Sequence, residues 1–178
     1  MELNSTSYVL LGFLASGFGS GYDIKALADK SVRFFWNLSY GQIYPELKRL
    51  ADAGFAEATD DPRGSRRRTT YRLTTKGRKV LRDWLAQDSI TPVELRDEML
   101  LKLFFSDAMS KNDQLALIRS MRRRQASIVA TLRAIEPLAS QPGAPPSKLM
   151  VLKTGIELHQ QYARSLAEAE RQVTKTKG

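Results

Sequence analysis

The stretch Ser39-Tyr40-Gly41-Gln42-Ile43-Tyr44-Pro45-Glu46-Leu47-Lys48-Arg49-Leu50 decides how the rest of the chain is interpreted. Ile43, Leu47 and Leu50 recur at helical spacing, so they form one apolar edge that can be buried. Ser39 is a good N-cap, and Gln42 follows three residues later, as a capping box requires. Polar, aromatic and basic side chains occupy the other face, which could lie in a DNA major groove. An ordinary surface helix has the same pattern, so the surrounding sequence must decide.

Pro45 complicates the start of this helix. If Ser39 is the cap, the proline lies in the second turn, where its ring should clash with the carbonyl of Gly41 and one hydrogen bond is lost. Either the helix starts nearer Gly41 or it is kinked. The first option weakens the capping box and leaves Ser39 and Tyr40 in the turn.

Two shorter helices are predicted before this stretch. The first runs from Ser5 to Ala15 and is broken by a glycine-rich run at residues 17–21. The second runs from Tyr22 to Val32 with Ser20 as its cap, and an aromatic cluster follows at residues 34–36. Three short helices, the third with polar residues outward, form a helix-turn-helix pattern.

A β-hairpin is predicted directly after these helices. Asp52-Ala53-Gly54 ends the third helix, and a weak strand follows at residues 55–59. Turn residues at 60–65 lead into a stronger strand at 69–74, in which Tyr71 and Leu73 point inward. A hairpin behind a three-helix unit indicates a winged helix.

The hairpin region is strongly basic. Between Pro62 and Arg82 the nine charged residues are all basic: Arg63, Arg66, Arg67, Arg68, Arg72, Lys76, Arg78, Lys79 and Arg82. A tip with Arg66, Arg67 and Arg68 can reach phosphates or a narrow minor groove. The alternative is a solvated loop that keeps an edge strand soluble.

Composition limits the classes of protein that this chain can belong to. It has 178 residues and a net charge of +9, which suits a polyanionic partner. There are no cysteines, so disulfides and thiol catalysis are excluded. No apolar run is long enough to span a bilayer, and no basic segment precedes the first apolar stretch. We therefore expect a cytoplasmic protein that does not enter a membrane.

The chain is expected to divide into a DNA-binding domain at residues 1–88 and a helical dimerisation domain at 89–178. The first domain closes with a helix capped by Thr74 or Thr75, whose apolar edge is Val80, Leu81, Trp84 and Leu85. The segment 87–92 is a plausible boundary.

The second half is predicted to be almost entirely helical. Residues 96–105 are apolar nearly all round and must be covered on several sides. A long helix from Ser110 to Glu136, ended by Pro137 and a proline-rich turn at 142–146, is followed by another at 147–174. Both have heptad-like apolar stripes, so they form an antiparallel hairpin. We infer burial against a second subunit; purely intramolecular pairing is the alternative.

The sequence contains no recognisable catalytic or metal site. Its single histidine, His159, lies on the apolar stripe of the last helix and is interpreted as a packed or interfacial residue. One histidine without cysteine or a carboxylate pair is a poor metal ligand set. No nucleophile-elbow or phosphate-loop motif occurs. We expect a protein that is not an enzyme and needs no cofactor or metal.

Several segments resemble the PadR family of bacterial transcriptional regulators. They are Leu10–Leu14, Gly21–Ile24, the quoted stretch with its G-x-I-Y-P-x-L-x-x-L core, and Tyr71–Gly77. Residues 96–105 resemble the start of the C-terminal domain in the longer subgroup. The resemblance covers almost the whole chain, although after Phe105 it is one of length and pattern only.

The resemblance implies a homodimer of winged helix-turn-helix domains joined through C-terminal helices. Such proteins usually repress genes from pseudo-palindromic operators, and some release DNA on binding a small hydrophobic or phenolic compound. By position, Tyr44, Tyr22 and Lys25 match family residues near the phosphate backbone. Many relatives have a histidine where this chain has Ser20, so any role of that histidine is not carried over.

These observations give a hypothesis for contacts with double-stranded DNA. Gln42 and Tyr40 read base edges, with Gln42 preferred, because glutamine can bond adenine in two places. Phosphates are held by Ser39, Tyr44, Lys48 and Arg49, and the wing adds Arg66, Arg67 and Arg68. A winged helix used only for protein–protein assembly is the rival, and the basic hairpin argues against it.

A site for a small-molecule effector is a separate hypothesis. Phe35, Trp36 and Phe105, with Phe34 and Phe104, could line a cavity between the DNA-binding domain and the dimer helices. The alternative is that these aromatic side chains belong to an ordinary core.

Overall fold

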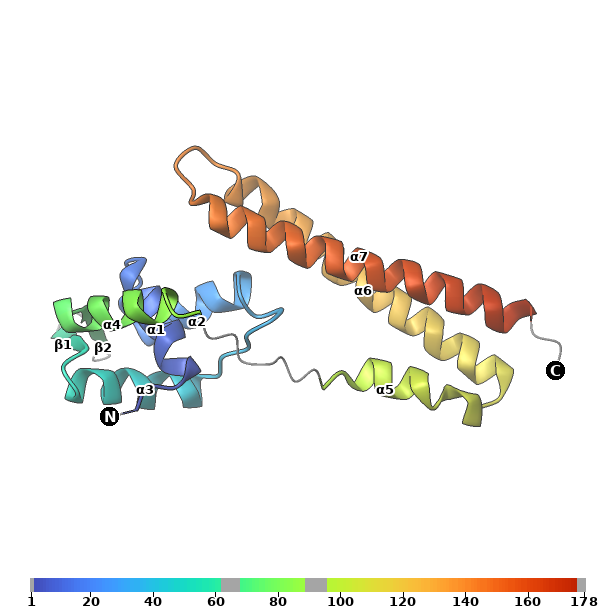
Figure 1. The fold of residues 1–178 in the computed structure, drawn as a ribbon, viewed down its shortest axis with the longest axis horizontal. Helices are drawn as coiled ribbons and strands as arrows, with labels where there is room; N and C mark the ends of the chain where they lie inside the picture. Colours follow the sequence, from blue (N-terminus) through green and yellow to red (C-terminus); the bar gives the residue numbers. More distant parts are fainter. Residues whose placement is uncertain (1, 62–67, 89–95, 176–178) are drawn as a thin grey trace. The chain divides into compact units, whose positions relative to one another are not determined.

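The computed structural model describes residues 2–61, 68–88 and 96–175, in two compact units, Met1–Thr91 and Pro92–Gly178. The first unit contains α1 (Ser5–Ala15), α2 (Gly21–Lys30), α3 (Tyr40–Asp52), β1 (Ala56–Asp61), β2 (Arg68–Leu73) and α4 (Thr75–Leu85). The second contains α5 (Glu98–Phe104), a short 3-10 helix at Ser106–Ala108, α6 (Lys111–Ala139) and α7 (Pro146–Lys175) (Figure 1). The predicted mostly α fold, a winged helix-turn-helix with a two-stranded wing followed by long helices, is confirmed.

The helices of the first unit begin at side chains that cap their free backbone N–H groups. Asn4 caps α1 in a capping box with Ser7, and Ser20 and Thr74 cap α2 and α4. The helix over Ser5–Ala15 and the cap of Ser20 are confirmed. The second helix ends at Lys30, two residues before the predicted Val32.

Ser39 and Gln42 form the predicted capping box at the start of α3. The alternative start near Gly41 is therefore wrong, and Pro45 lies inside the helix. Pro45 has no N–H to donate to the carbonyl of Gly41. Both residues are exposed, so water can reach that carbonyl.

The hairpin is joined to the segment that precedes α2. Strands β1 and β2 are antiparallel, with Ala58 opposite Tyr71. The N–H of Tyr71 donates to the carbonyl of Gly19 over 2.6 Å. A Cβ at Gly19 would lie 2.9 Å from the carbonyl oxygen of Tyr71, so this approach suits glycine alone. Asp60 and Asp61 belong to β1, which corrects the prediction that they form the turn.

One apolar core holds the first unit together. Leu10 and Leu11 of α1, Ile24 of α2, and the inner edge of α3 have no exposed surface. Each fully buried side chain of this size contributes about 1.5–3 kcal/mol. The first two helices and the hairpin therefore form a rigid support behind α3.

The predicted apolar edge of α4 is only partly buried. Leu81 is buried and Val80 packs against the core. Trp84 stacks on Tyr8, with ring centroids 4.6 Å apart, but keeps 38% of its surface exposed. Leu85 is 67% exposed, so its assignment to this edge is wrong. Leu85 is the last residue of α4.

Helices α6 and α7 run side by side as a hairpin (Figure 1). The buried positions of α6 are Ile118, Met121, Gln125 and Leu132, and those of α7 are Ile156 and Leu166. These positions lie on the predicted stripes. The predicted end of the first long helix at Glu136 is wrong, because α6 continues through Pro137 to Ala139. Only the carbonyl of Arg133 loses a partner there, and this residue faces solvent.

Helix α5 packs on the α6–α7 hairpin through one side. Met99 and Leu103 contact the cluster formed by Ile118, Met121 and Leu166. Leu101, Phe104 and Phe105 are 57%, 77% and 61% exposed. Within the described part of this unit, α5 is therefore covered on one side only. The sequence predicts cover on several sides, and that prediction is not met there.

Candidate nucleic-acid interface

Helix α3 presents a polar and aromatic face over a completely buried edge. Ile43, Leu47 and Leu50 have no exposed surface. The side exposed to solvent carries Tyr40, Gln42, Tyr44, Pro45 and Lys48, together with Ser39 just before the helix. A helix held this firmly from behind can present side chains to a groove in a fixed register.

Gln42 both caps the helix and offers a donor to solvent. Its side-chain oxygen lies 2.9 Å from both the backbone nitrogen and the hydroxyl oxygen of Ser39, which donate to it. The side-chain nitrogen has no partner among the described residues. Hydrogen bonding to adenine in two places would therefore require the oxygen to leave Ser39.

Tyr44 packs against the start of α2. A Cβ at Gly21 would lie 2.6 Å from the Tyr44 ring, so the close approach of the two helices depends on glycine. Tyr40 stacks on Tyr44 with centroids 5.9 Å apart. Lys25 of α2 forms an ion pair with Asp29 and places its Nζ 5.8 Å from the Tyr40 centroid. The structure thus brings Lys25, Tyr40 and Tyr44 together, as the proposed contact set requires.

Tyr22 and Lys48 extend this surface in two directions. Tyr22, next to Gly21, is 62% exposed. Lys48 forms an exposed ion pair with Asp52 over 2.7 Å, and this hydrogen bond raises the pKa of Lys48. An exposed helical pair of this kind contributes little to stability, so Lys48 can exchange Asp52 for a phosphate.

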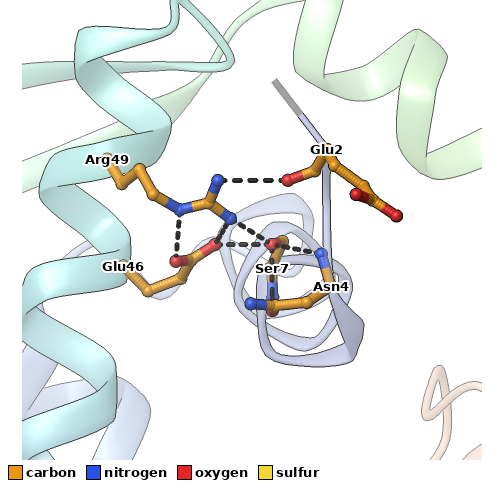
Figure 2. Close-up of polar contacts among 5 residues, drawn as sticks. All are labelled: Glu2, Asn4, Ser7, Glu46 and Arg49. Carbon is orange, nitrogen blue, oxygen red and sulfur yellow. Dashed lines mark hydrogen bonds and ion pairs between the residues drawn. The ribbon is translucent and has the colours of Figure 1, made fainter.

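Arg49 is engaged by other residues of the chain, and its role as a phosphate contact stays a prediction. Its Nε and Nη2 donate to the two carboxylate oxygens of Glu46 over 2.7 and 2.6 Å (Figure 2). Nη2 also donates to the hydroxyl of Ser7, and Nη1 donates to the carbonyl of Glu2 over 3.1 Å. The guanidinium is therefore engaged between α3 and the beginning of the chain.

This network is the feature that inspection of the sequence missed. Burial raises the pKa of Glu46, but hydrogen bonds from Arg49 and Ser7, with the positive charge of Arg49, outweigh it and lower the pKa. The only local signal was an acidic and a basic residue three apart, beside the apolar edge of the helix.

The wing can be described only in part. Arg66 and Arg67 lie outside the described residues. Arg68 begins β2 opposite Asp61. Farther along the same strand, Arg72 is exposed and Tyr71 is buried, as the predicted alternation requires.

The three proposed effector residues lie in different units. Phe35 and Trp36 are 62% and 38% exposed in the segment between α2 and α3, whereas Phe105 belongs to the second unit. A cavity lined by all three stays a prediction.

The described ranges hold neither a cluster of metal ligands nor a membrane-spanning helix. No group of three or more histidine, aspartate or glutamate side chains is placed to hold a metal ion there. No described helix combines the length and apolar character needed to cross a bilayer.

Two family profiles match the chain. The "Transcriptional regulator PadR-like family" matches residues 10–83, and "Virulence activator alpha C-term" matches residues 95–174. These ranges correspond to the winged helix unit and the helical unit.

Individual proteins match as well. "Negative transcriptional regulator PadR" of Bacillus subtilis (strain 168) is 35% identical over 123 residues, which are 68% of each chain. The crystal structure of Bacillus subtilis PadR in complex with operator DNA has a TM-score of 0.86, is 27% identical, and is matched over 96% of this chain and 99% of that one. The same protein in complex with p-coumaric acid has a TM-score of 0.78 and 27% identity, over 97% and 100% of the two chains. With its fold, its exposed α3 face and these matches, the chain belongs to the PadR-like family of transcriptional regulators.

Proposed function

We propose that this chain is a dimeric repressor that binds a pseudo-palindromic operator in double-stranded DNA with α3 in the major groove. The observation that carries the proposal is the contrast within α3 between a fully buried edge and an exposed face with Tyr40, Gln42, Tyr44 and Lys48. The name of the 35% identical relative and the operator complex of Bacillus subtilis PadR support repression and operator binding.

The proposed contacts are of two kinds: some read base edges, and others hold the phosphate backbone of the DNA. Gln42 reads a base edge through its free side-chain nitrogen, and Tyr40 is the second candidate. The phosphate contacts are Tyr22, Lys25, Ser39, Tyr44 and Lys48, with Arg66, Arg67 and Arg68 on the wing. Arg49 is left out because its guanidinium is engaged by Glu46 and Ser7.

A small hydrophobic or phenolic compound is proposed to release the DNA. The p-coumaric acid complex of Bacillus subtilis PadR supports this class of ligand. Phe35, Trp36 and Phe105 are the proposed contacts, since exposed aromatic side chains suit an aromatic acid. Saturable quenching of Trp36 fluorescence, compared with a Trp36→Phe variant, is the expected result with such a compound.

We also propose that the protein has no catalytic activity or cofactor, and that it acts in the cytoplasm, where a bacterial regulator meets the chromosome. The rival function is a winged helix that assembles proteins. It predicts weak duplex binding that does not respond to salt, which the basic hairpin sequence argues against.

The deciding experiment is footprinting of the gene's own upstream region with the purified protein. We expect protection of an inverted repeat whose half-sites lie about one helical turn, or a multiple of one, apart. An Arg67→Ala variant should bind all duplexes more weakly and lower the salt slope by about one for each Arg67 of the dimer. Equal affinity and slope in that variant would remove the wing from the proposed interface.

A further inference from the structure

Glu46 is a buried carboxylate on the helix that faces DNA. It is only 8% exposed, between the buried positions Ile43 and Leu47. One carboxylate oxygen lies 2.5 Å from the hydroxyl of Ser7 and 2.6 Å from Nη2 of Arg49. The other lies 2.7 Å from Nε of Arg49 (Figure 2).

The same contacts reach the beginning of the chain. Ser7 belongs to the capping box of α1 and exchanges hydrogen bonds of 3.0 Å with Asn4. Arg49 adds a bond to the carbonyl of Glu2, ahead of that cap. Helix α3 is therefore fixed to the N-terminal end of α1 by directional bonds as well as by the apolar core (Figure 2).

A buried ion pair does not have to increase stability. The desolvation penalty of two charges can exceed their attraction, so well-packed apolar residues often stabilise a fold equally well. An ion pair joined by hydrogen bonds is directional, because its bonds form only at one rotation and one position of the helix. Apolar contacts between α1 and α3 are not directional, so they define the rotation of α3 about its axis less sharply than these hydrogen bonds do.

Such a rotation would affect base and phosphate contacts differently. A base-edge bond forms only over about 2.7–3.2 Å with good alignment. Lysine and tyrosine contacts to phosphates come from long side chains that can readjust. A loosened α3 would therefore lose discrimination between sequences before it loses general affinity for DNA.

We propose that Glu46, acting through Arg49 and Ser7, is a positioning residue that sets the sequence specificity of α3 without touching DNA. This inference rests on the proposed operator binding. It gives two neighbouring basic residues different roles: Arg49 orients the helix, and Lys48 contacts the DNA.

The test compares the loss of the buried ion pair with the loss of one exposed positive charge on α3. The double variant Glu46→Leu/Arg49→Met replaces the ion pair by apolar side chains, and the control Lys48→Met removes an exposed cation. Binding is measured at several salt concentrations, to a duplex selected from a random pool by the unmodified protein and to an unrelated duplex. A thermal melt of each variant confirms folding.

For the double variant we expect affinity for the selected duplex to fall about tenfold, comparable to losing one base contact, with unrelated-duplex affinity and the salt slope unchanged. For Lys48→Met we expect both affinities to fall together and the slope to drop by about 0.9 for each protomer of the dimer. Should the double variant not fold, Ser7→Ala is expected to lower the selected-to-unrelated ratio alone.

Two results would overturn the inference. An unchanged ratio in the double variant and in Ser7→Ala would mean that the network does not position α3. A drop of about 0.9 per protomer in the slope of the double variant would make Arg49 a phosphate contact after all. If the unmodified protein selects no duplex and binds without salt dependence, the proposed function itself fails, which is a different outcome.

Discussion

The side-chain oxygen of Gln42 accepts hydrogen bonds of 2.9 Å from both the backbone N–H and the hydroxyl of Ser39. The residue that we propose as the base reader therefore also completes the first turn of α3. Stability and recognition are linked at this one side chain, and two substitutions can separate them.

Gln42→Glu retains the acceptor oxygen but has no N–H to donate, whereas Gln42→Ala loses both. We expect Gln42→Glu to unfold like the unmodified chain, because a carboxylate serves in a capping box and suits a helix N-terminus. Gln42→Ala should lose about 0.5–1 kcal/mol of stability. Both should lower the ratio of selected-duplex to unrelated-duplex affinity. An unchanged ratio in Gln42→Glu would exclude the side-chain nitrogen as a base reader.

Gly77 and Gly12 are a matched pair of helical glycines with opposite surroundings. A Cβ at Gly77 would lie 2.1 Å from the carbonyl oxygen of Phe55, whereas at Gly12 nothing lies within 4 Å. Gly77→Ala should therefore force α4 away from the hairpin and cost about 3 kcal/mol. Gly12→Ala should stabilise the chain by about 0.5–1 kcal/mol. Urea unfolding of both variants measures this, and similar effects at the two positions would contradict the packing around α4.

Most helices and caps of this fold could be predicted because their causes are local in sequence. Asn4, Ser20, Ser39 and Thr74 each satisfy an N–H three residues away. Of these caps, Ser20 and Ser39 were expected from the sequence, as was Thr74 with Thr75 as its alternative. The spacing of the apolar residues then predicted which edge of each helix is buried. Errors of one to three residues arose at helix ends such as Pro137, where a missing hydrogen bond can be tolerated at the surface.

The role of Arg49 could not be predicted in the same way. Its spacing from Lys48 places it near the exposed face of α3, and nothing local indicates that Ser7 lies behind it. That contact joins residues 42 positions apart and depends on how α1 packs on α3. A basic residue on a recognition helix is assigned to DNA by default, and the packing of α1 on α3 is what supports a different role for Arg49.

The exposed side of α5 predicts where a second subunit binds. Phe104 and Phe105 meet edge to face, with centroids 5.0 Å apart, beside the exposed Leu101. Phe104→Glu should weaken dimerisation about 30-fold or more in sedimentation equilibrium, the effect of a central aromatic contact. Lys102→Gln, on the same helix, should leave the dimer intact. Equal association of all three proteins would favour purely intramolecular pairing of the long helices.

His159 predicts a pH dependence of stability that originates in the second unit. Its Nδ1 lies 2.7 Å from the side-chain oxygen of the buried Gln125, so this nitrogen carries the proton in the neutral ring. Burial lowers the pKa of His159 from its ordinary 6.5. Between the lowered pKa and 6.5, the folded chain therefore binds fewer protons here than the unfolded chain does.

The stabilising effect of a neutral His159 should be complete above about pH 6.5 and should be lost as the pH falls from there toward the lowered pKa. His159→Gln cannot titrate, so the difference in unfolding free energy between the two proteins should shrink or change sign as the pH is lowered from 8 to 5. Because His159 is the only histidine of the chain, few other groups titrate in this range. Urea unfolding of both proteins across these pH values measures the difference. A difference that stays constant from pH 8 to 5 would mean that burial of this ring does not affect its protonation.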